Sequence, residues 1–211
     1  VKTIKSNDKG LIDFSDFKDN IDENFAGVMI TNPNTCGLFE TDIVKISELT
    51  HKSGGYLYCD GANFNAVVGK LKPGDLGIDA MHINLHKTFS TPHGGGGPGS
   101  GPVVFSDRLE KFCPTPLVKN IKGDFILVED SNEKDLTKSF GRLNVFHGQM
   151  GMFVRAMSYM LSHGADGLKQ VSEDAVLNAN YLRASLSSHL TPAFDGFCMH
   201  EILFSDDFLK D

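Results

Sequence analysis

The chain has 211 residues, of which 40% are hydrophobic and 22% are charged, and its formal net charge is −7. These values are ordinary for a globular domain, and the acidic balance argues against nucleic acid as a partner. No run approaches the roughly 18 apolar residues of a membrane span, and the first residues lack the apolar region of a signal peptide. Because the chain does not begin with Met, we expect it to start partway through a longer protein.

Strands and helices alternate along the first half of the chain. The hydrophobic period and the turn residues predict, in chain order, a polar turn over 7–10, a brief helix from Asp13, a buried strand over 27–31 ending at Asn32, a helix over 41–52 capped by Thr41, and a strand over 56–59 that stops at Asp60. This alternation favours a mostly parallel α/β sheet with flanking helices.

A lysine follows the next apolar run. Met81, Ile83 and Leu85 alternate with polar residues, which is the period of a half-buried strand. Lys87 falls just past the expected end of this strand, where apolar neighbours would partly desolvate its amine and leave it free to attack a carbonyl. A lysine that forms a Schiff base needs this environment, whereas the ordinary alternative is a solvated surface lysine.

The second half of the chain is less regular. The pattern predicts a strand over 102–105, a helical turn over 106–111, a strand over 125–130, a polar turn over 131–135, helices over 149–162 and 165–188, and a strand over 197–204. The Met and Phe residues of the first long helix are expected in the core. The second helix is expected to bury one face, made of Leu168, Val171, Ala175, Asn178, Leu182 and Leu186.

Three residues with useful chemistry each follow a predicted strand of the sheet. They are Asn32, Asp60 and Lys87. Ligands of open α/β sheets collect at the carboxyl ends of the strands, so we expect these three residues to converge on one site. The four cysteines stand far apart and form no C-x-x-C motif, which favours reduced thiols in a cytosol-like compartment.

Pyridoxal phosphate suits a lysine and a carboxylate placed in this way. Its ring accepts electrons best while the pyridine nitrogen is protonated, and a neighbouring carboxylate keeps it so. Asp60 fits that role because the small Gly61 and Ala62 leave room for a flat ring, although an Asx-turn or a helix cap is the structural alternative. Asn32 suits either the ring phenolate oxygen or a simple turn, and His86 suits the phosphate, a proton transfer or the core.

A glycine-rich loop follows Lys87, from Gly94 to Gly101. It has neither the G-K-[ST] of a Walker A motif nor a G-x-G-x-x-G between strand and helix. We interpret it as a loop that lets the backbone pass close to a ligand, or as a plain connection. His82, His86 and His93 lie nearby, but no carboxylate or thiol completes a zinc set with them, so no metal site is expected.

Several motifs together resemble glycine decarboxylase, the P-protein of the glycine cleavage system. They are TNPNTCGLFE, YCDGANFNA, NLHKTFSTPHGGGGPGSGP, HGQMGMFVRAMSYM and SEDAVLNANYLRA. The similarity covers essentially the whole chain and corresponds to the carboxyl-terminal half of that protein, or to its subunit 2. It implies the fold-type-I architecture of enzymes that depend on pyridoxal phosphate. Residues 1–163 would then be part of the large cofactor-binding domain, and residues 164–211 the long helix and the beginning of a small α/β domain.

The resemblance also implies roles for individual residues. Lys87 would bind pyridoxal 5'-phosphate and act in catalysis together with His86, while Asp60 would pair with the pyridine nitrogen. Asn32, Ala62 and His86 would line the cofactor. His93, which lies in the same signature, would approach the substrate.

The implied reaction is the decarboxylation of glycine with transfer of the aminomethyl group to the lipoyl arm of the H-protein. Its partners would be glycine, the lipoylated H-protein, and the remaining part or the other subunit of the P-protein, in a homo- or hetero-oligomer. Neither nucleic acid nor a membrane is expected as a partner. The implied location is a bacterial cytoplasm or, in a eukaryote, the mitochondrial matrix.

Two other interpretations stay open. Aminotransferases, desulfurases and other decarboxylases of fold type I share the order Asn, Asp, Lys. Alternatively, the chain is a non-catalytic structural piece of a larger assembly. Members of the family carry a phosphate-binding turn and a ring-stacking histidine upstream of the part seen here, so we expect the 211 residues alone to bind cofactor weakly or not at all and to lack decarboxylase activity.

Overall fold

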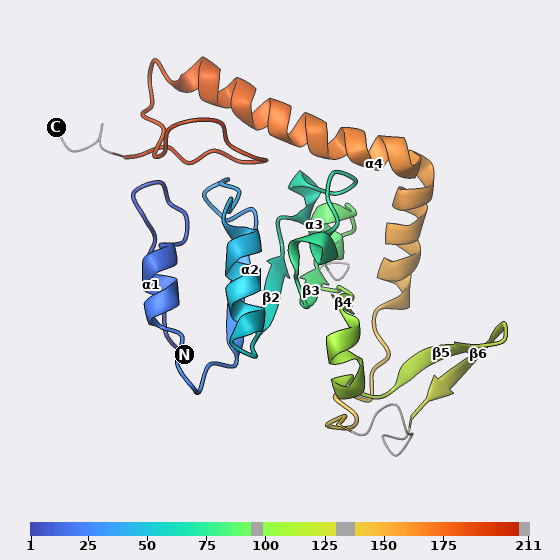
Figure 1. Ribbon diagram of the computed structural model, residues 1–211. Coiled ribbons are helices and arrows are strands. Elements are labelled where there is room, and N and C mark those ends of the chain that lie inside the picture. Colours follow the sequence, from blue (N-terminus) through green and yellow to red (C-terminus); the bar gives the residue numbers. More distant parts are fainter. Residues whose placement is uncertain (94–98, 130–137, 207–211) are drawn as a thin grey trace.

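The computed structural model describes residues 1–93, 99–129 and 138–206. Helices α1 and α2 lie to one side of a four-stranded sheet, whereas α4 lies on the opposite side and then bends across the top of the view in Figure 1. The elements are α1 (Phe14–Asp19), β1 (Gly27–Thr31), α2 (Ile43–Lys52), β2 (Tyr56–Gly61), η1 (Phe64–Ala66), η2 (Pro73–Leu76), β3 (Ala80–Ile83), α3 (Leu85–Thr88), β4 (Val103–Phe105), η3 (Asp107–Phe112), β5 (Leu117–Ile121), β6 (Asp124–Val128) and α4 (Met150–Leu186).

The sheet has the order β1-β2-β3-β4. The first three strands are parallel, and β4 runs antiparallel to β3. The predicted α/β class with a mostly parallel sheet is therefore confirmed. Within the described residues, no helix has the combination of length and apolar character that crossing a bilayer requires.

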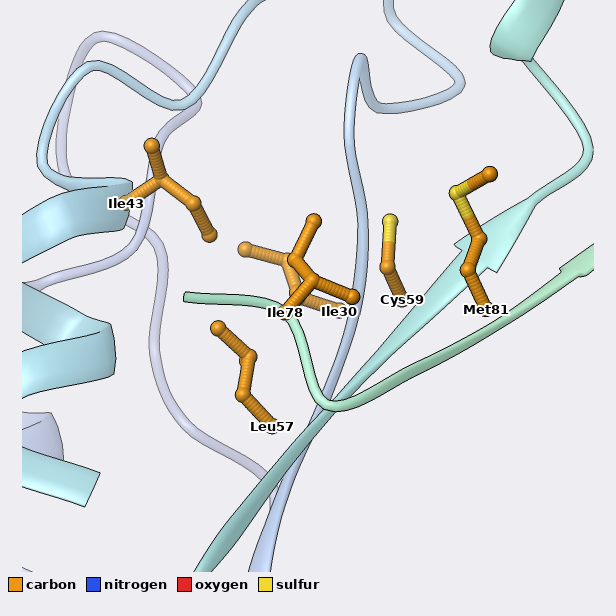
Figure 2. Packing of buried hydrophobic residues seen from close by; sticks show 6 residues of the cluster. All are labelled: Ile30, Ile43, Leu57, Cys59, Ile78 and Met81. Atoms are coloured by element: carbon orange, nitrogen blue, oxygen red, sulfur yellow. The ribbon is translucent and has the colours of Figure 1, made fainter. Parts of the chain in front are cut away.

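The main core lies between the sheet and α2. Alternate residues of β2 point into it, because side chains of a strand face opposite sides of the sheet in turn. Leu57 and Cys59 are 0% and 1% exposed. They pack with Ile30 of β1, Ile43 of α2 and Met81 of β3, as Figure 2 shows. The residues of β2 that alternate with Leu57 and Cys59 therefore lie on the face opposite to the core.

A buried carboxylate joins four elements of the fold. Asp79, which precedes β3, is 2% exposed. It accepts a hydrogen bond from the backbone N–H of Leu57 and lies 2.8 Å from Nε2 of His51 on α2. The guanidinium of Arg108 and the hydroxyl of Ser106 donate to it from the other side. A buried charge is tolerated because each of its oxygens has donors.

Three predicted boundaries in the first half differ from the structure. Helix α2 begins at Ile43 with Asp42 as its N-cap, not Thr41, and Asp42 makes no side-chain capping bond. Strand β2 continues through Asp60 to Gly61, so Asp60 belongs to the strand and does not follow it. The strand before the lysine is shorter than its alternating pattern, because the chain turns at Asn84 into the short helix α3.

The second half of the chain contains a hairpin that the pattern predicted only in part. Its second strand, β6, starts one residue before the predicted strand, and its first strand, β5, was missed. Both strands expose most of their apolar side chains, so they lack the alternation of a half-buried strand. The predicted turn over 131–135 and the last residue of the predicted strand, Asp130, lie outside the described residues.

The two predicted long helices form one element, α4, broken at Gly164 by a non-helical backbone (φ 63°, ψ −173°). The buried face of its second half is only partly the predicted one, since Leu168, Val171, Ala175 and Leu186 are half-buried. Ser172 and Ala179 are its buried residues, whereas Asn178 and Leu182 are exposed. The helix lies close against η1 and the turn after it, where a Cβ added at Gly69 would come within 3.1 Å of the Cα of Lys169.

The expected strand over 197–204 is wrong. Apart from a bridge between Pro192 and Phe204, this segment is irregular. It is held by side chains instead of by a sheet: Asn180 of α4 bonds both the N–H and the carbonyl of Cys198. Met199 then donates its N–H to the carbonyl of Gly37 at 2.7 Å. The segment therefore lies between α4 and the loop that follows β1.

Candidate functional site at the carboxyl edge of the sheet

The carboxyl ends of β1, β2 and β3 bring the predicted residues to one edge. Thr31 is the register partner of Asp60, and Asp60 is the partner of His82. Asn32 follows Thr31 directly, so it lies at the same level as the end of β2. The loops beyond the strands are tied together as well, because Asn63 donates a hydrogen bond to the carbonyl of Pro33.

Asn32 is buried and only half satisfied. Its Oδ1 accepts a hydrogen bond from the backbone N–H of Glu40 at 3.0 Å. Its Nδ2 is buried without a hydrogen-bond partner. An unpaired buried donor costs free energy, about 1–3 kcal/mol, unless a ligand accepts from it. The amide is thus oriented by the protein and offers its donor to the edge of the sheet.

Oδ1 of Asp60 accepts one hydrogen bond and makes one ion-pair contact. The backbone N–H of Ala62 lies 2.9 Å from Oδ1, and Nε2 of His82 lies 3.2 Å from it. The first contact is the Asx-turn considered as the structural alternative for this residue. Both contacts are made to Oδ1, so the second oxygen, Oδ2, remains available to another donor, from the protein or from a ligand. The other nitrogen of His82, Nδ1, is 2.7 Å from the hydroxyl of Tyr58.

Lys87 lies on α3, one helical turn beyond β3, and its side chain is exposed. No apolar residue of the described part of the chain buries the Lys87 side chain, so the prediction that apolar neighbours desolvate its amine is wrong there. The reason is the change of period at Asn84: Leu85 and Phe89 lie four residues apart on the buried face of the turn, and Lys87 lies on the other face. Lys87 nevertheless follows the carboxyl end of β3 by one helical turn, at the edge of the sheet where β1 and β2 end.

His86 and His93 form a pair next to Lys87. Their rings are 4.3 Å apart in an edge-to-face arrangement. Nδ1 of His86 is buried without a hydrogen-bond partner. Burial lowers the pKa of His86, and the nearby His93 and Lys87 lower it further. His86 is therefore neutral at neutral pH and keeps a nitrogen lone pair. Most of the glycine loop, residues 94–98, lies outside the described residues.

A pair that the pattern did not single out, His200 and Glu201, reaches this edge from the irregular segment after α4. The side chain of His200 is 9% exposed, and its Nε2 lies 3.2 Å from Oε1 of Glu201. Burial and the charge of Lys87 lower the pKa of His200, while Glu201 raises it. Only the long-range packing reveals this approach, because His200 lies 113 positions after Lys87 in the sequence. The only local hint of a polar site there was the dipeptide His-Glu.

Unsatisfied polar atoms gather at this edge. Seven side-chain atoms of described residues are buried without a partner, and five of them belong to Asn32, His86, Thr88, His200 and Glu201. A polar ligand is the ordinary explanation for such a cluster. The cluster does not have the composition of a metal centre: among the described residues, no group of three His, Cys, Asp or Glu side chains is arranged to hold an ion.

Two apolar cavities lie away from Lys87. One, of about 550 Å³, is lined by η1, α4 and the segment after it. The other, of about 760 Å³, lies between β4, η3 and β5. Both lack the cluster of unpaired polar atoms, so the strand edge is the better candidate site.

The arginines differ in their availability. Arg108 is bonded to Asp79, and Arg142 to Glu129 at 2.6 Å. Arg155 is exposed on the first half of α4. Arg183, on the second half, has a buried Nε without a hydrogen-bond partner. The first two are therefore committed to structural pairs.

A mostly parallel sheet with an antiparallel edge strand and flanking helices is the architecture of fold-type-I enzymes, a class that depends on pyridoxal phosphate. Solved structures agree with this class. The chain superposes on a crystal structure of glycine decarboxylase (P-protein) of the glycine cleavage system, in inhibitor-bound form, with a TM-score of 0.66 and 26% identity over 83% of this chain and 41% of that one. A cysteine desulfurase from Thermococcus onnurineus gives a TM-score of 0.63 at 11% identity over 97% of this chain and 50% of that one, which shows the fold alone.

The chain belongs to the family of the glycine cleavage system P-protein, whose family model matches residues 2–207. A relative from Caulobacter vibrioides, named probable glycine dehydrogenase (decarboxylating) subunit 2, is 59% identical over the whole chain. The chain spans about two fifths of the length of that relative, since it covers 40% of it. The sequence resemblance to this family is confirmed.

Proposed function

We propose that the complete protein containing this chain decarboxylates glycine and transfers the aminomethyl group to the lipoyl arm of an H-protein, with pyridoxal 5'-phosphate as its cofactor. This is the reaction of a glycine dehydrogenase (decarboxylating), the name that the Caulobacter relative carries. The observation that supports it most is that Asn32, Asp60 and Lys87 stand at or just beyond the carboxyl ends of three neighbouring strands in a chain of the P-protein family.

The polar atoms at this edge suit pyridoxal phosphate. Lys87 offers an exposed amine that can bond to the cofactor aldehyde. Asp60 offers Oδ2 to the ring nitrogen, while the small Ala62 leaves space beside it. Asn32 offers its unpaired Nδ2 to the phenolate oxygen. The bound cofactor would supply an electron sink for the pair of electrons left when carbon dioxide departs.

The histidines beside Lys87 are proposed to handle protons and anionic groups. His86 is neutral at neutral pH, so its lone-pair nitrogen can accept a proton from the Lys87 ammonium, while its N–H nitrogen can donate to a phosphate oxygen. His93 contacts His86 from the side, and we assign it to the substrate side. No metal is needed for these roles.

The proposed partners follow from the same reaction. They are glycine, a lipoylated H-protein, and the rest of the P-protein or its other subunit, in an oligomer. A bacterial cytoplasm is the proposed location, and the bacterial source of the relative supports it over a mitochondrial matrix. We also propose a division into residues 1–163 and 164–211, which the break of α4 at Gly164 supports.

The test is reduction with borohydride after incubation with pyridoxal phosphate, followed by peptide mass mapping. In the complete protein we expect one pyridoxyl adduct, on Lys87, and none in a Lys87→Ala variant. Lys52, an exposed lysine at the end of α2, serves as the control position. An adduct that persists elsewhere in the Lys87→Ala variant, with glycine decarboxylation intact, would contradict the proposal. The 211 residues alone are expected to show no turnover.

A further inference from the structure

A line of three polar side chains runs along one face of β2 and β3. Tyr58 and Asp60 are two residues apart on β2, and His82 is the register partner of Asp60 on β3. The alternation of strands therefore places all three on the face opposite to Leu57, Cys59 and Met81, which form the core. The side chains of Asp60 and His82 are each 27% exposed, so water screens their contact only partly.

The contacts of His82 use both of its ring nitrogens. Nδ1 lies 2.7 Å from the hydroxyl of Tyr58, and Nε2 lies 3.2 Å from Oδ1 of Asp60. The rings of Tyr58 and His82 are stacked, with centroids 5.9 Å apart and planes 27° apart. In such a line the position of one proton determines the position of the next. The reason is that a neutral imidazole is a donor at one nitrogen and an acceptor at the other.

The chemistry of the two ends decides the direction of the hydrogen bonds. A carboxylate is only an acceptor, so Asp60 requires the proton on Nε2 of His82. Nδ1 is then the acceptor and receives the phenol proton of Tyr58. Burial raises the pKa of Tyr58, and the charge of Asp60 raises it further, so the phenol keeps that proton. The opposite tautomer would turn a nitrogen lone pair toward the carboxylate.

We propose that Tyr58 and His82 are positioning residues of the cofactor site: Tyr58 donates to Nδ1 and so supports the tautomer of His82 that Asp60 requires, and His82 holds Oδ1 of Asp60 so that Oδ2 serves the ring nitrogen of the cofactor. This inference rests on the proposed function, because it assumes that Asp60 meets that ring. Oδ1 of Asp60 accepts the N–H of Ala62 and also lies 3.2 Å from Nε2 of His82, so both contacts hold the same oxygen.

Two substitutions of one residue separate the hydrogen bond from simple packing. In His82→Gln the side-chain amide can place an N–H close to the position of Nε2, whereas His82→Leu keeps the bulk and loses the donor. The measurement is the dissociation constant for pyridoxal phosphate of the complete protein, followed by the visible absorbance of the bound cofactor. We expect His82→Leu to raise that constant about tenfold, the effect of one hydrogen bond to a charged group. His82→Gln should stay within about threefold of the unsubstituted protein.

Tyr58→Phe gives an intermediate case, because His82 keeps its contact with Asp60 but loses the hydroxyl that supports its tautomer. We expect an increase of about threefold. His189→Leu is the matched control, since His189 is exposed near the end of α4, and it should change nothing. Equal weakening by His82→Gln and His82→Leu, or no weakening by His82→Leu, would overturn the inference.

The mapping experiment keeps the two proposals apart. If the unsubstituted protein forms the adduct on Lys87 and His82→Leu binds the cofactor equally well, the role of His82 fails while the proposed function stands. If the unsubstituted protein forms no adduct on Lys87, the proposed function fails first and the inference falls with it.

Discussion

Arg108 contacts both carboxylate oxygens of Asp79 through one nitrogen, at 2.8 and 2.9 Å, and this pair joins η3 to the start of β3. Asp79 also accepts the N–H of Leu57 on β2 and contacts His51 on α2. The pair thus fixes the strand that leads toward Lys87 against its neighbours. It stabilises the site through the fold and touches none of the site residues.

Replacing Asp79 by Asn should strongly destabilise the protein. The change leaves Arg108 and the other donors without their buried anion, which costs about 1–3 kcal/mol because the Arg108 side chain itself stays partly in water. The measurement is the free energy of unfolding of the complete protein in denaturant. Glu129→Gln is the matched control, because it breaks the more exposed pair with Arg142, whose loss should cost below about 1 kcal/mol. Similar costs for the two variants would contradict the assignment.

The same carboxylate predicts a loss of stability in acid. Burial raises the pKa of Asp79, but the N–H of Leu57, His51 and Arg108 together lower it more, so it lies below its usual value. A lowered pKa in the folded state gives stability that is complete above the unfolded pKa, about 3.9, and is lost as the pH falls through the folded value. The stability difference between the unsubstituted protein and Asp79→Asn should shrink below about pH 4. A difference that stays constant from pH 7 to pH 3 would speak against it.

Gly37 is predicted to hold the segment that carries His200 at the sheet edge. Its φ is +75°, and a Cβ there would overlap the carbonyl oxygen of Glu201. Gly37→Ala should therefore lower the melting temperature and make the segment after α4 more sensitive to proteolysis. Gly54→Ala is the control, because Gly54 has a similar φ of +80° but open space around it. It should cost only the backbone strain of about 1–2 kcal/mol; an equal effect of both would show that the contact with Glu201 is unimportant.

A substitution of Asn32 can separate its structural contact, which is made by Oδ1, from its proposed ligand contact, which is made by Nδ2. Asn32→Asp keeps the acceptor for the N–H of Glu40 but replaces the unpaired donor Nδ2. We expect this variant to bind pyridoxal phosphate about tenfold more weakly, as for the loss of one hydrogen bond to a charged oxygen. Asn34→Asp is the comparison, since Asn34 lies in the next turn and bonds only backbone groups. Unchanged cofactor affinity in Asn32→Asp would mean that Asn32 only stabilises its turn and does not bind the cofactor.

Cys59 should be inert toward thiol reagents in the folded protein. It lies in the core and is 1% exposed, and burial raises its pKa to about 11. Cys36 lies in the turn after β1 and is half-buried, so it should react first. The check is mass mapping after a short exposure to iodoacetamide, with and without denaturant. Modification of Cys59 before unfolding would show that the core between the sheet and α2 opens readily.

Much of the site's framework was open to prediction from local pattern. The strand over Gly27–Thr31 has the predicted bounds, and the parallel order of β1, β2 and β3 places Asn32 and Asp60 at one edge. The carboxyl-edge rule needs only the order of strands and the residues after them, and both can be read along the chain. The family motifs then supported the same residues.

Tertiary packing decided the rest. The exposed position of Lys87 follows from a turn into helix at Asn84 that the alternation of Met81, Ile83 and Leu85 did not reveal. The approach of His200 depends on contacts of Cys198 and Met199 with elements far away in the sequence.

The sequence by itself determined the class of fold and the set of residues available for chemistry. Both depend on hydrophobic periodicity and on the succession of strands and helices along the chain, which are local properties. The partners of those residues were decided by three-dimensional packing. His82 meets Tyr58 and Asp60 only once β2 and β3 pair in one register, and a slip of one residue would turn its side chain to the opposite face.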